Sequence, residues 1–145
     1  MKISDAGLDF IRAHEGCRLT AYPDPATGGK PWTIGIGHCG PEVHLGMTIT
    51  EAEALELLRK DCEVAEKCLA EHCPGPLTQN QWDSLVSFIY NVGCGNFRSS
   101  TLAKMINMGN LEGAAAQFQR WNLANKKVMA GLTTRRAHEA QLFQA

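Results

Sequence analysis

His14-Glu15-Gly16-Cys17-Arg18-Leu19 places a carboxyl group at the end of an expected helix. Tyr22-Pro23-Asp24 follows with a second carboxyl group on a loop, and Trp32-Thr33-Ile34-Gly35-Ile36-Gly37-His38 reads as a glycine-rich strand that carries a hydroxyl. Two carboxyl groups and a hydroxyl are the minimum equipment for acid-assisted hydrolysis. This stretch, residues 13–40, therefore decides both the fold and the expected chemistry.

The first expected helix runs from Asp5 to Glu15, with Ser4 as its N-cap and Gly16 as its C-terminal stop. The spacing of its apolar residues places Glu15 on the buried stripe. Burial there would raise the pKa of the acid and suit a proton donor. The alternative is a helix-end carboxylate paired with Arg12 or Arg18.

The composition indicates a single soluble domain of 145 residues with a net charge of −1. The charge is unevenly spread: residues 1–90 carry 7 Lys and Arg against 13 Asp and Glu, whereas residues 91–145 carry 7 against 2. Such a split favours binding to an anionic polymer, or it is ordinary surface variation. The first residues are polar, which indicates no signal peptide and synthesis in a cytoplasm.

The chain has six cysteines, and their spacing matches no zinc site. We expect free thiols in partly buried positions. The alternative is disulfides formed in an oxidising compartment, and three of the cysteines are close enough in sequence to pair locally: Cys62, Cys68 and Cys73.

The rest of the chain predicts an α+β, mostly helical fold. We expect a sheet lobe, a small antiparallel sheet over about residues 16–48. A long helix over about 50–73, which starts with the capping box at Thr50, connects it to a helical lobe. The helical lobe comprises about residues 77–145 together with the first helix, 4–15. The other expected elements are four helices and a basic loop over 122–131. The helices are expected over residues 81–92 (capped by Thr78-Gln79-Asn80-Gln81 and ended by Gly93 and Gly95), from Ser99 or Ser100 to 108, over 111–121 and from Thr133 to the end. A cleft between the lobes would hold Glu15, Asp24 and Thr33.

These three motifs resemble the active-site signature of the phage-type lysozymes, the endolysins of glycoside hydrolase family 24. The signature is Glu-Gly-x-Arg-Leu, then Tyr-x-Asp, then Thr-Ile-Gly-x-Gly-His. The segments 81–93 and 131–143 are similar to the central helix and the C-terminal part of the family, so the resemblance covers essentially the whole chain. It implies a lysozyme-like fold and a single catalytic domain, 1–145.

The resemblance implies a muramidase that hydrolyses the β-1,4 bond between N-acetylmuramic acid and N-acetylglucosamine in peptidoglycan, with inversion. Glu15 matches the proton donor, and Asp24 matches the aspartate that stabilises positive charge and positions the attacking water. Thr33 matches the threonine that holds this water, and His38 matches a histidine paired with a neighbouring carboxylate. We also expect substrate contacts from the matching segments of the helical lobe, at Asn91, Arg135 and Arg136.

The sequence departs from the family pattern in the longer, proline-rich hairpin after Asp24. It has Asn125-Lys126-Lys127 where many members have Gly-Gly-Lys. Some relatives regulate themselves by thiol exchange near the position of Cys17, but they carry an N-terminal membrane anchor, so we expect an ordinary thiol here.

We expect no cofactor, no metal, no nucleic-acid partner and no stable membrane insertion. The expected protein is a monomer in the host bacterial cytoplasm that depends on a holin to reach the wall in the periplasm. Three alternatives remain: a non-catalytic peptidoglycan-binding module, an antibacterial effector with the same chemistry, and a lytic transglycosylase.

Overall fold

The computed structural model describes residues 1–145 and divides them into two compact units. The sheet unit comprises Leu8–Glu63, and the helical unit comprises Met1–Gly7 with Val64–Ala145. This division places most of the first helix with the sheet, whereas the sequence predicts it with the helical lobe. No helix is long and apolar enough to cross a bilayer.

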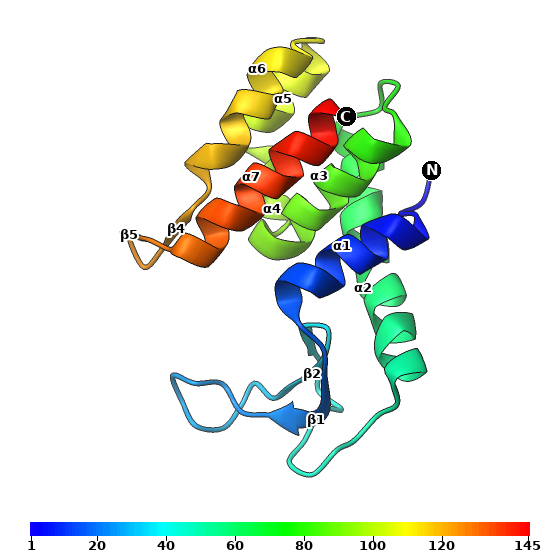
Figure 1. The fold of residues 1–145 in the computed structure, drawn as a ribbon, viewed down its shortest axis with the longest axis vertical. Helices are drawn as coiled ribbons and strands as arrows, with labels where there is room; N and C mark the ends of the chain where they lie inside the picture. The colour runs from blue at the N-terminus through cyan, green and yellow to red at the C-terminus, as the bar shows by residue number, and fades with distance from the viewer. The chain divides into compact units, whose positions relative to one another are not determined.

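The sheet unit begins at Leu8, within helix α1 (Asp5–Glu15), and this helix passes almost directly into the first strand (Figure 1). Strands β1 (Arg18–Tyr22), β2 (Thr33–Gly35) and β3 (His38–Cys39) form the expected antiparallel sheet, and the structure gives their order as β1-β2-β3. One face of this sheet packs on a small apolar cluster: Ala21, Ile34 and Val43, with Trp32, Met47, Ile49 and Leu57 against them.

Helix α2 (Glu51–His72) supports the sheet through a close approach at Gly35. A side-chain carbon at Gly35 would lie 3.4 Å from Ala54 of α2, and the residue has φ +67°, a value that favours glycine. The capping box that predicted the start of this helix is confirmed, because Thr50 accepts from the Glu53 N–H while the Glu53 carboxylate accepts from the Thr50 N–H.

The helical unit is built around α3 (Gln79–Val92), which is buried from Trp82 to Ile89. A capping box between Thr78 and Gln81 starts α3, and Gly93 ends it. Figure 1 shows α7 (Ala130–Gln144) lying between α3 and α6 (Leu111–Gln117), and α7 contacts both of these helices. Edge-to-face rings fill the interior: Phe88 contacts Phe97, Phe118 and Trp121.

The remaining elements correct four of the expectations. Gly95 does not end α3, because it lies in a separate short helix, α4 (Cys94–Arg98). The next helix, α5 (Thr101–Asn107), has Ser100 as its N-cap, as expected. The helix predicted over 111–121 is α6 followed by the 3-10 turn η1 (Phe118–Arg120). The basic segment expected as a loop is a hairpin of β4 (Leu123–Ala124) and β5 (Lys127–Val128), and α7 starts three residues before Thr133.

Candidate active site

Glu15 is the last residue of α1, and the chain turns away immediately after it. Gly16 has φ +78°, and its N–H donates to the Arg12 carbonyl at 2.8 Å, which closes the helix. Leu8 and Ile11 are buried as the spacing predicted, but Glu15 itself is only half-buried. Its carboxyl group is therefore placed at a helix end that solvent can reach.

The two arginines considered as partners of Glu15 both contact other groups. Arg12 forms an ion pair with Glu51 in the first turn of α2. The Arg18 guanidinium lies 4.6 Å from the centre of the Tyr22 ring, a cation–π contact. The first of these contacts fixes the end of α1 against α2, one turn before Glu15.

Asp24 lies just past the end of β1, in a turn that closes on Asp24 itself. Its N–H donates to the Gly29 carbonyl at 3.0 Å, and its carbonyl accepts from the Gly28 N–H at 2.8 Å. Its Oδ1 atom accepts from the Ala26 N–H at 2.7 Å, an arrangement typical of aspartate in turns. The long hairpin after Asp24 therefore holds this half-buried carboxyl group in place, and Oδ2 is the oxygen that the turn does not use.

Thr33 is the first residue of β2 and lies opposite Tyr22, two residues before Asp24. On its other side it pairs with Cys39 of β3, and its Oγ1 atom is 3.0 Å from the Cys39 Sγ atom. The β1–β2 pairing thus brings Thr33 to the same end of the sheet as Asp24. The sequence does not predict the contact with Cys39, because a pairing across a two-residue strand leaves no periodic signal.

His38 is held from both sides by carboxylates, as the resemblance implied. Its Nδ1 atom is 2.7 Å from Asp61 Oδ2 of α2, and its Nε2 atom is 2.6 Å from Glu42 Oε1. Burial lowers the pKa of His38, but the hydrogen bonds to Glu42 and Asp61 outweigh that effect and leave the pKa raised. The pairing is confirmed, and it joins β3 to α2.

The other predicted site residues lie in the helical unit, and two of them are in its interior. Arg135 is 4% exposed and Arg136 is 0% exposed, and both form ion pairs with the buried Glu139. Such burial is at odds with the expected substrate contact, and we assign both arginines to the packing of α7 on α3. Asn91 is exposed, and its Oδ1 atom accepts from Arg136 Nη2 at 2.7 Å.

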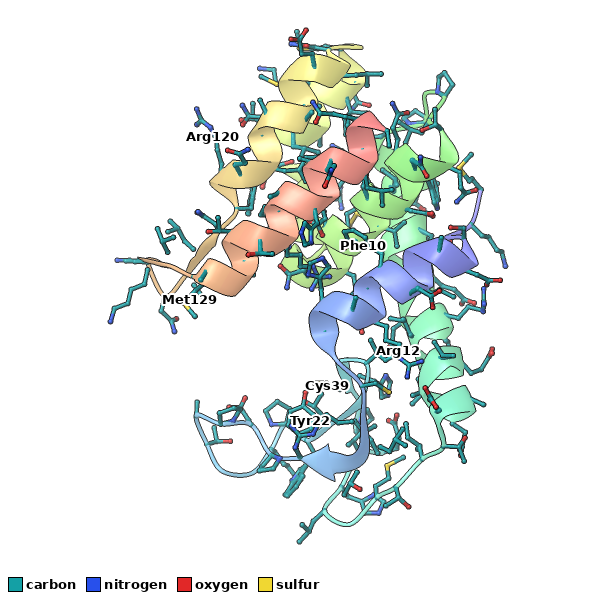
Figure 2. The ribbon with its side chains drawn as sticks, viewed as in Figure 1. Phe10, Arg12, Tyr22, Cys39, Arg120 and Met129 are labelled. Atoms are coloured by element: carbon teal, nitrogen blue, oxygen red, sulfur yellow. A yellow bond between two sulfur atoms is a disulfide. The ribbon has the colours of Figure 1, made fainter.

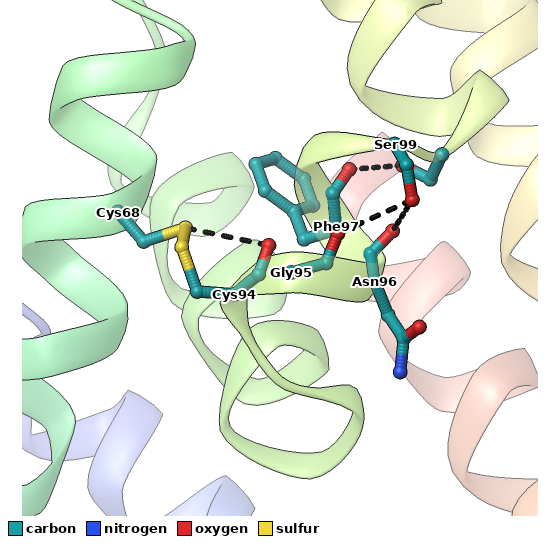
Figure 3. Close-up of a disulfide and its surroundings, with 7 residues drawn as sticks. Cys68, Cys94, Gly95, Asn96, Phe97 and Ser99 are labelled. Atoms are coloured by element: carbon teal, nitrogen blue, oxygen red, sulfur yellow. Dashed lines mark hydrogen bonds between the residues drawn. A yellow bond between two sulfur atoms is a disulfide. The ribbon is translucent and has the colours of Figure 1, made fainter.

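The six cysteines divide differently from the expectation of free thiols. Cys68 of α2 and Cys94 of α4 form a disulfide, shown in Figure 3, whereas Cys17, Cys39, Cys62 and Cys73 are not disulfide-bonded. A local pairing among Cys62, Cys68 and Cys73 is wrong, because the partner of Cys68 is 26 residues away. Burial raises the pKa of the Cys73 thiol to about 11. No group of three or more His, Cys, Asp or Glu side chains is arranged to hold a metal ion.

Comparison with known proteins identifies this arrangement. A sequence model of the phage lysozyme family matches residues 12–139, which include all three motifs of the sheet unit. The chain belongs to the phage lysozyme family. It is similar to the endolysin of Bacillus phage PZA, with 44% identity over 145 residues. The match covers 100% of this chain but 56% of the PZA endolysin, so this chain spans about half the length of that relative.

Two further relatives match along nearly their whole length. The endolysin of Salmonella phage P22 is 40% identical over 147 residues, which cover 99% of this chain and 98% of that protein. The solved muramidase domain of SpmX from Asticaccaulis excentricus superimposes with a TM-score of 0.90 at 36% identity, covering 99% of this chain and 98% of that one. The mostly helical, lysozyme-like fold expected from the sequence is confirmed.

Proposed function

We propose that this phage lysozyme family member is an endolysin muramidase that hydrolyses the β-1,4 bond between N-acetylmuramic acid and N-acetylglucosamine in peptidoglycan. The observation that carries the proposal is the placement of Glu15, Asp24 and Thr33 on consecutive elements of the sheet unit: a helix end, a closed turn and a paired strand. The names of the relatives, endolysin and muramidase, support the same activity.

In the proposed mechanism, Glu15 donates a proton to the oxygen of the departing sugar. Asp24 accepts a proton from the attacking water through the carboxylate oxygen that its turn leaves unused, and it stabilises the positive charge that develops on the sugar ring. Thr33 holds the same water through its hydroxyl group. Attack by water on the face opposite to the departing oxygen gives inversion, which requires the two carboxyl groups to lie about 6.5–9.5 Å apart.

The test compares the purified protein with Glu15→Gln on isolated peptidoglycan sacculi. We expect Glu15→Gln to abolish the release of reducing ends, because an amide N–H is far too weak an acid to transfer its proton to the departing oxygen. The matched control is Glu56→Gln, which removes the same charge from an exposed position on α2 of the same unit. Release of reducing ends by Glu15→Gln at the wild-type rate would refute the assignment of the acid.

Mass spectrometry of the released muropeptides separates the alternatives. A muramidase gives products with reducing N-acetylmuramic acid, whereas a lytic transglycosylase gives anhydro products. Binding to sacculi with no released product would indicate a peptidoglycan-binding module.

We also propose, from membership of the phage lysozyme family, that the protein acts as a monomer and reaches the wall after a holin has permeabilised the cytoplasmic membrane. Expression in bacteria with and without a membrane-permeabilising holin tests this. Lysis that needs no holin would contradict the dependence, and a gene for an immunity protein beside this one would favour the effector.

A further inference from the structure

The proposed water-holding residue Thr33 has a polar neighbour outside the proposed catalytic set. Cys39 is a free, exposed cysteine on β3, directly across from Thr33 on β2. Directly opposed residues of an antiparallel pair bring their side chains together, and here the Thr33 Oγ1 and Cys39 Sγ atoms are 3.0 Å apart. Figure 2 labels both Cys39 and Tyr22, the residues that pair with Thr33 from the two neighbouring strands.

The position of Cys39 is fixed by the residue before it. His38 is held by Asp61 of α2 and by Glu42, at 2.7 Å and 2.6 Å. Two charge-assisted contacts on a side chain that is 13% exposed restrain the two-residue strand β3. A restrained strand therefore holds the Cys39 thiol against Thr33. Cys39 also lines a surface cavity of about 570 Å³, together with Trp32 and Val43.

The chemistry of the attacking water sets a requirement on Thr33. A water that attacks a sugar carbon must direct a lone pair at that carbon, so the protein must accept its protons. A threonine hydroxyl carries one proton and two lone pairs, and it accepts from the water most effectively when its own proton is directed elsewhere. A sulfur atom is a weak acceptor, but it lies within contact distance of Thr33 Oγ1.

We propose that Cys39 is a positioning residue: its sulfur accepts the Thr33 O–H, so that Oγ1 presents its lone pairs to the attacking water. The inference rests on the proposed muramidase mechanism and adds a residue to it. Cys39 does not touch the reacting atoms, and it acts only through Thr33.

A double-mutant cycle tests this dependence. Four proteins are compared on soluble peptidoglycan fragments: wild type, Cys39→Ala, Thr33→Val and the double variant. We expect Cys39→Ala to lower kcat about three- to tenfold, the range that one hydrogen bond of ordinary strength gives, with KM unchanged. In the Thr33→Val background, which has no hydroxyl to orient, the same Cys39→Ala change should leave kcat unaltered.

Two further variants distinguish positioning from a general effect on the strand. Cys39→Ser keeps an acceptor at the same place and should restore most of kcat. Cys17→Ala removes another free thiol of the sheet unit and should keep the wild-type kcat. Thermal melting of each variant verifies that the compared proteins are folded.

The outcomes separate the inference from the proposed function. An active wild type in which Cys39→Ala lowers kcat equally in both backgrounds, or changes kcat less than twofold, would overturn the role of Cys39 and leave the muramidase assignment standing. A wild type that releases no product from peptidoglycan would overturn both.

Discussion

Replacement of Glu139 by glutamine removes the acidic group of a buried charge cluster in the helical unit. Glu139 is 0% exposed, and its carboxylate faces three donors: Ser87 Oγ at 2.6 Å, Arg135 Nε at 3.3 Å and Arg136 Nε at 2.9 Å. Arg135 Nη2 also donates to the Ser87 carbonyl at 3.1 Å, so the cluster joins α7 to α3. The neutral amide of the Glu139→Gln variant would leave two buried guanidinium groups without this anion.

The magnitude depends on which partner is removed. Burial raises the pKa of Glu139, and Arg136 and Arg135 oppose that effect. If an arginine is lost, the remaining acid can take up a proton and become neutral, whereas a guanidinium cannot give up its proton when the acid is lost. We therefore expect Glu139→Gln to lower the free energy of unfolding by about 3–5 kcal/mol, and Arg135→Leu to lower it by less.

The assay is urea unfolding followed by far-UV circular dichroism, with linear extrapolation to water. A loss of this size is a large share of the about 5–15 kcal/mol that stabilises a typical domain, and it should lower Tm by about 10 °C. The control is Glu71→Gln, an exposed acid at the end of α2, for which we expect a change within about 0.5 kcal/mol. A loss below about 1 kcal/mol for Glu139→Gln would refute the claim that the buried cluster depends on its anion.

Two further predictions concern other cross-links in the fold. The contacts of His38 with Asp61 and Glu42 raise its pKa, so the protonated imidazole stabilises the native state. This contribution to stability is present in full below the pKa of His38 in the unfolded chain, about 6.5, and is lost as the pH rises through the pKa in the folded protein. Thermal melting across that pH range should show the loss in the wild type and not in His38→Asn, and equal pH dependence in the two proteins would contradict it. The disulfide between Cys68 and Cys94 closes a loop with a separation of 26 residues and should contribute about 3 kcal/mol. Dithiothreitol should therefore lower the Tm of the wild type but not that of Cys68→Ala, and an unchanged wild-type Tm would exclude this contribution.

The features that the sequence predicted well are those with a local physical cause. The capping boxes at Thr50 and Thr78 start their helices at or within two residues of the expected places, because each is a hydrogen-bond pattern within four residues. Gly16 stops α1 for an equally local reason, its positive φ. The small antiparallel sheet followed from the turns and from the glycine-rich run after Thr33.

The features that the sequence did not predict depend on distant partners or on an uncommon turn. The burial of Arg135 needs Ser87, which is 48 residues away, and a basic pair near a chain end ordinarily indicates a solvated surface. The hairpin of β4 and β5 turns at Asn125 and Lys126, with φ of +51° and +64°. Two positive φ values are typical of a type I′ turn, but Asn-Gly is its usual sequence, so Asn-Lys gave no signal.

The proposed chemistry lies in one unit, and the disulfide and the buried charge cluster lie in the other. All three proposed catalytic residues fall within residues 15–33 of the sheet unit, whereas the disulfide and the cluster around Glu139 belong to the helical unit. Within the sheet unit, α2 is the common support, because Glu51 holds Arg12 on the side of the acid and Asp61 holds His38 on the side of the water-holding strand. We therefore expect loss of the Arg12–Glu51 contact to affect the proposed proton donation by Glu15, and loss of the His38–Asp61 contact to affect the water that Thr33 is proposed to hold.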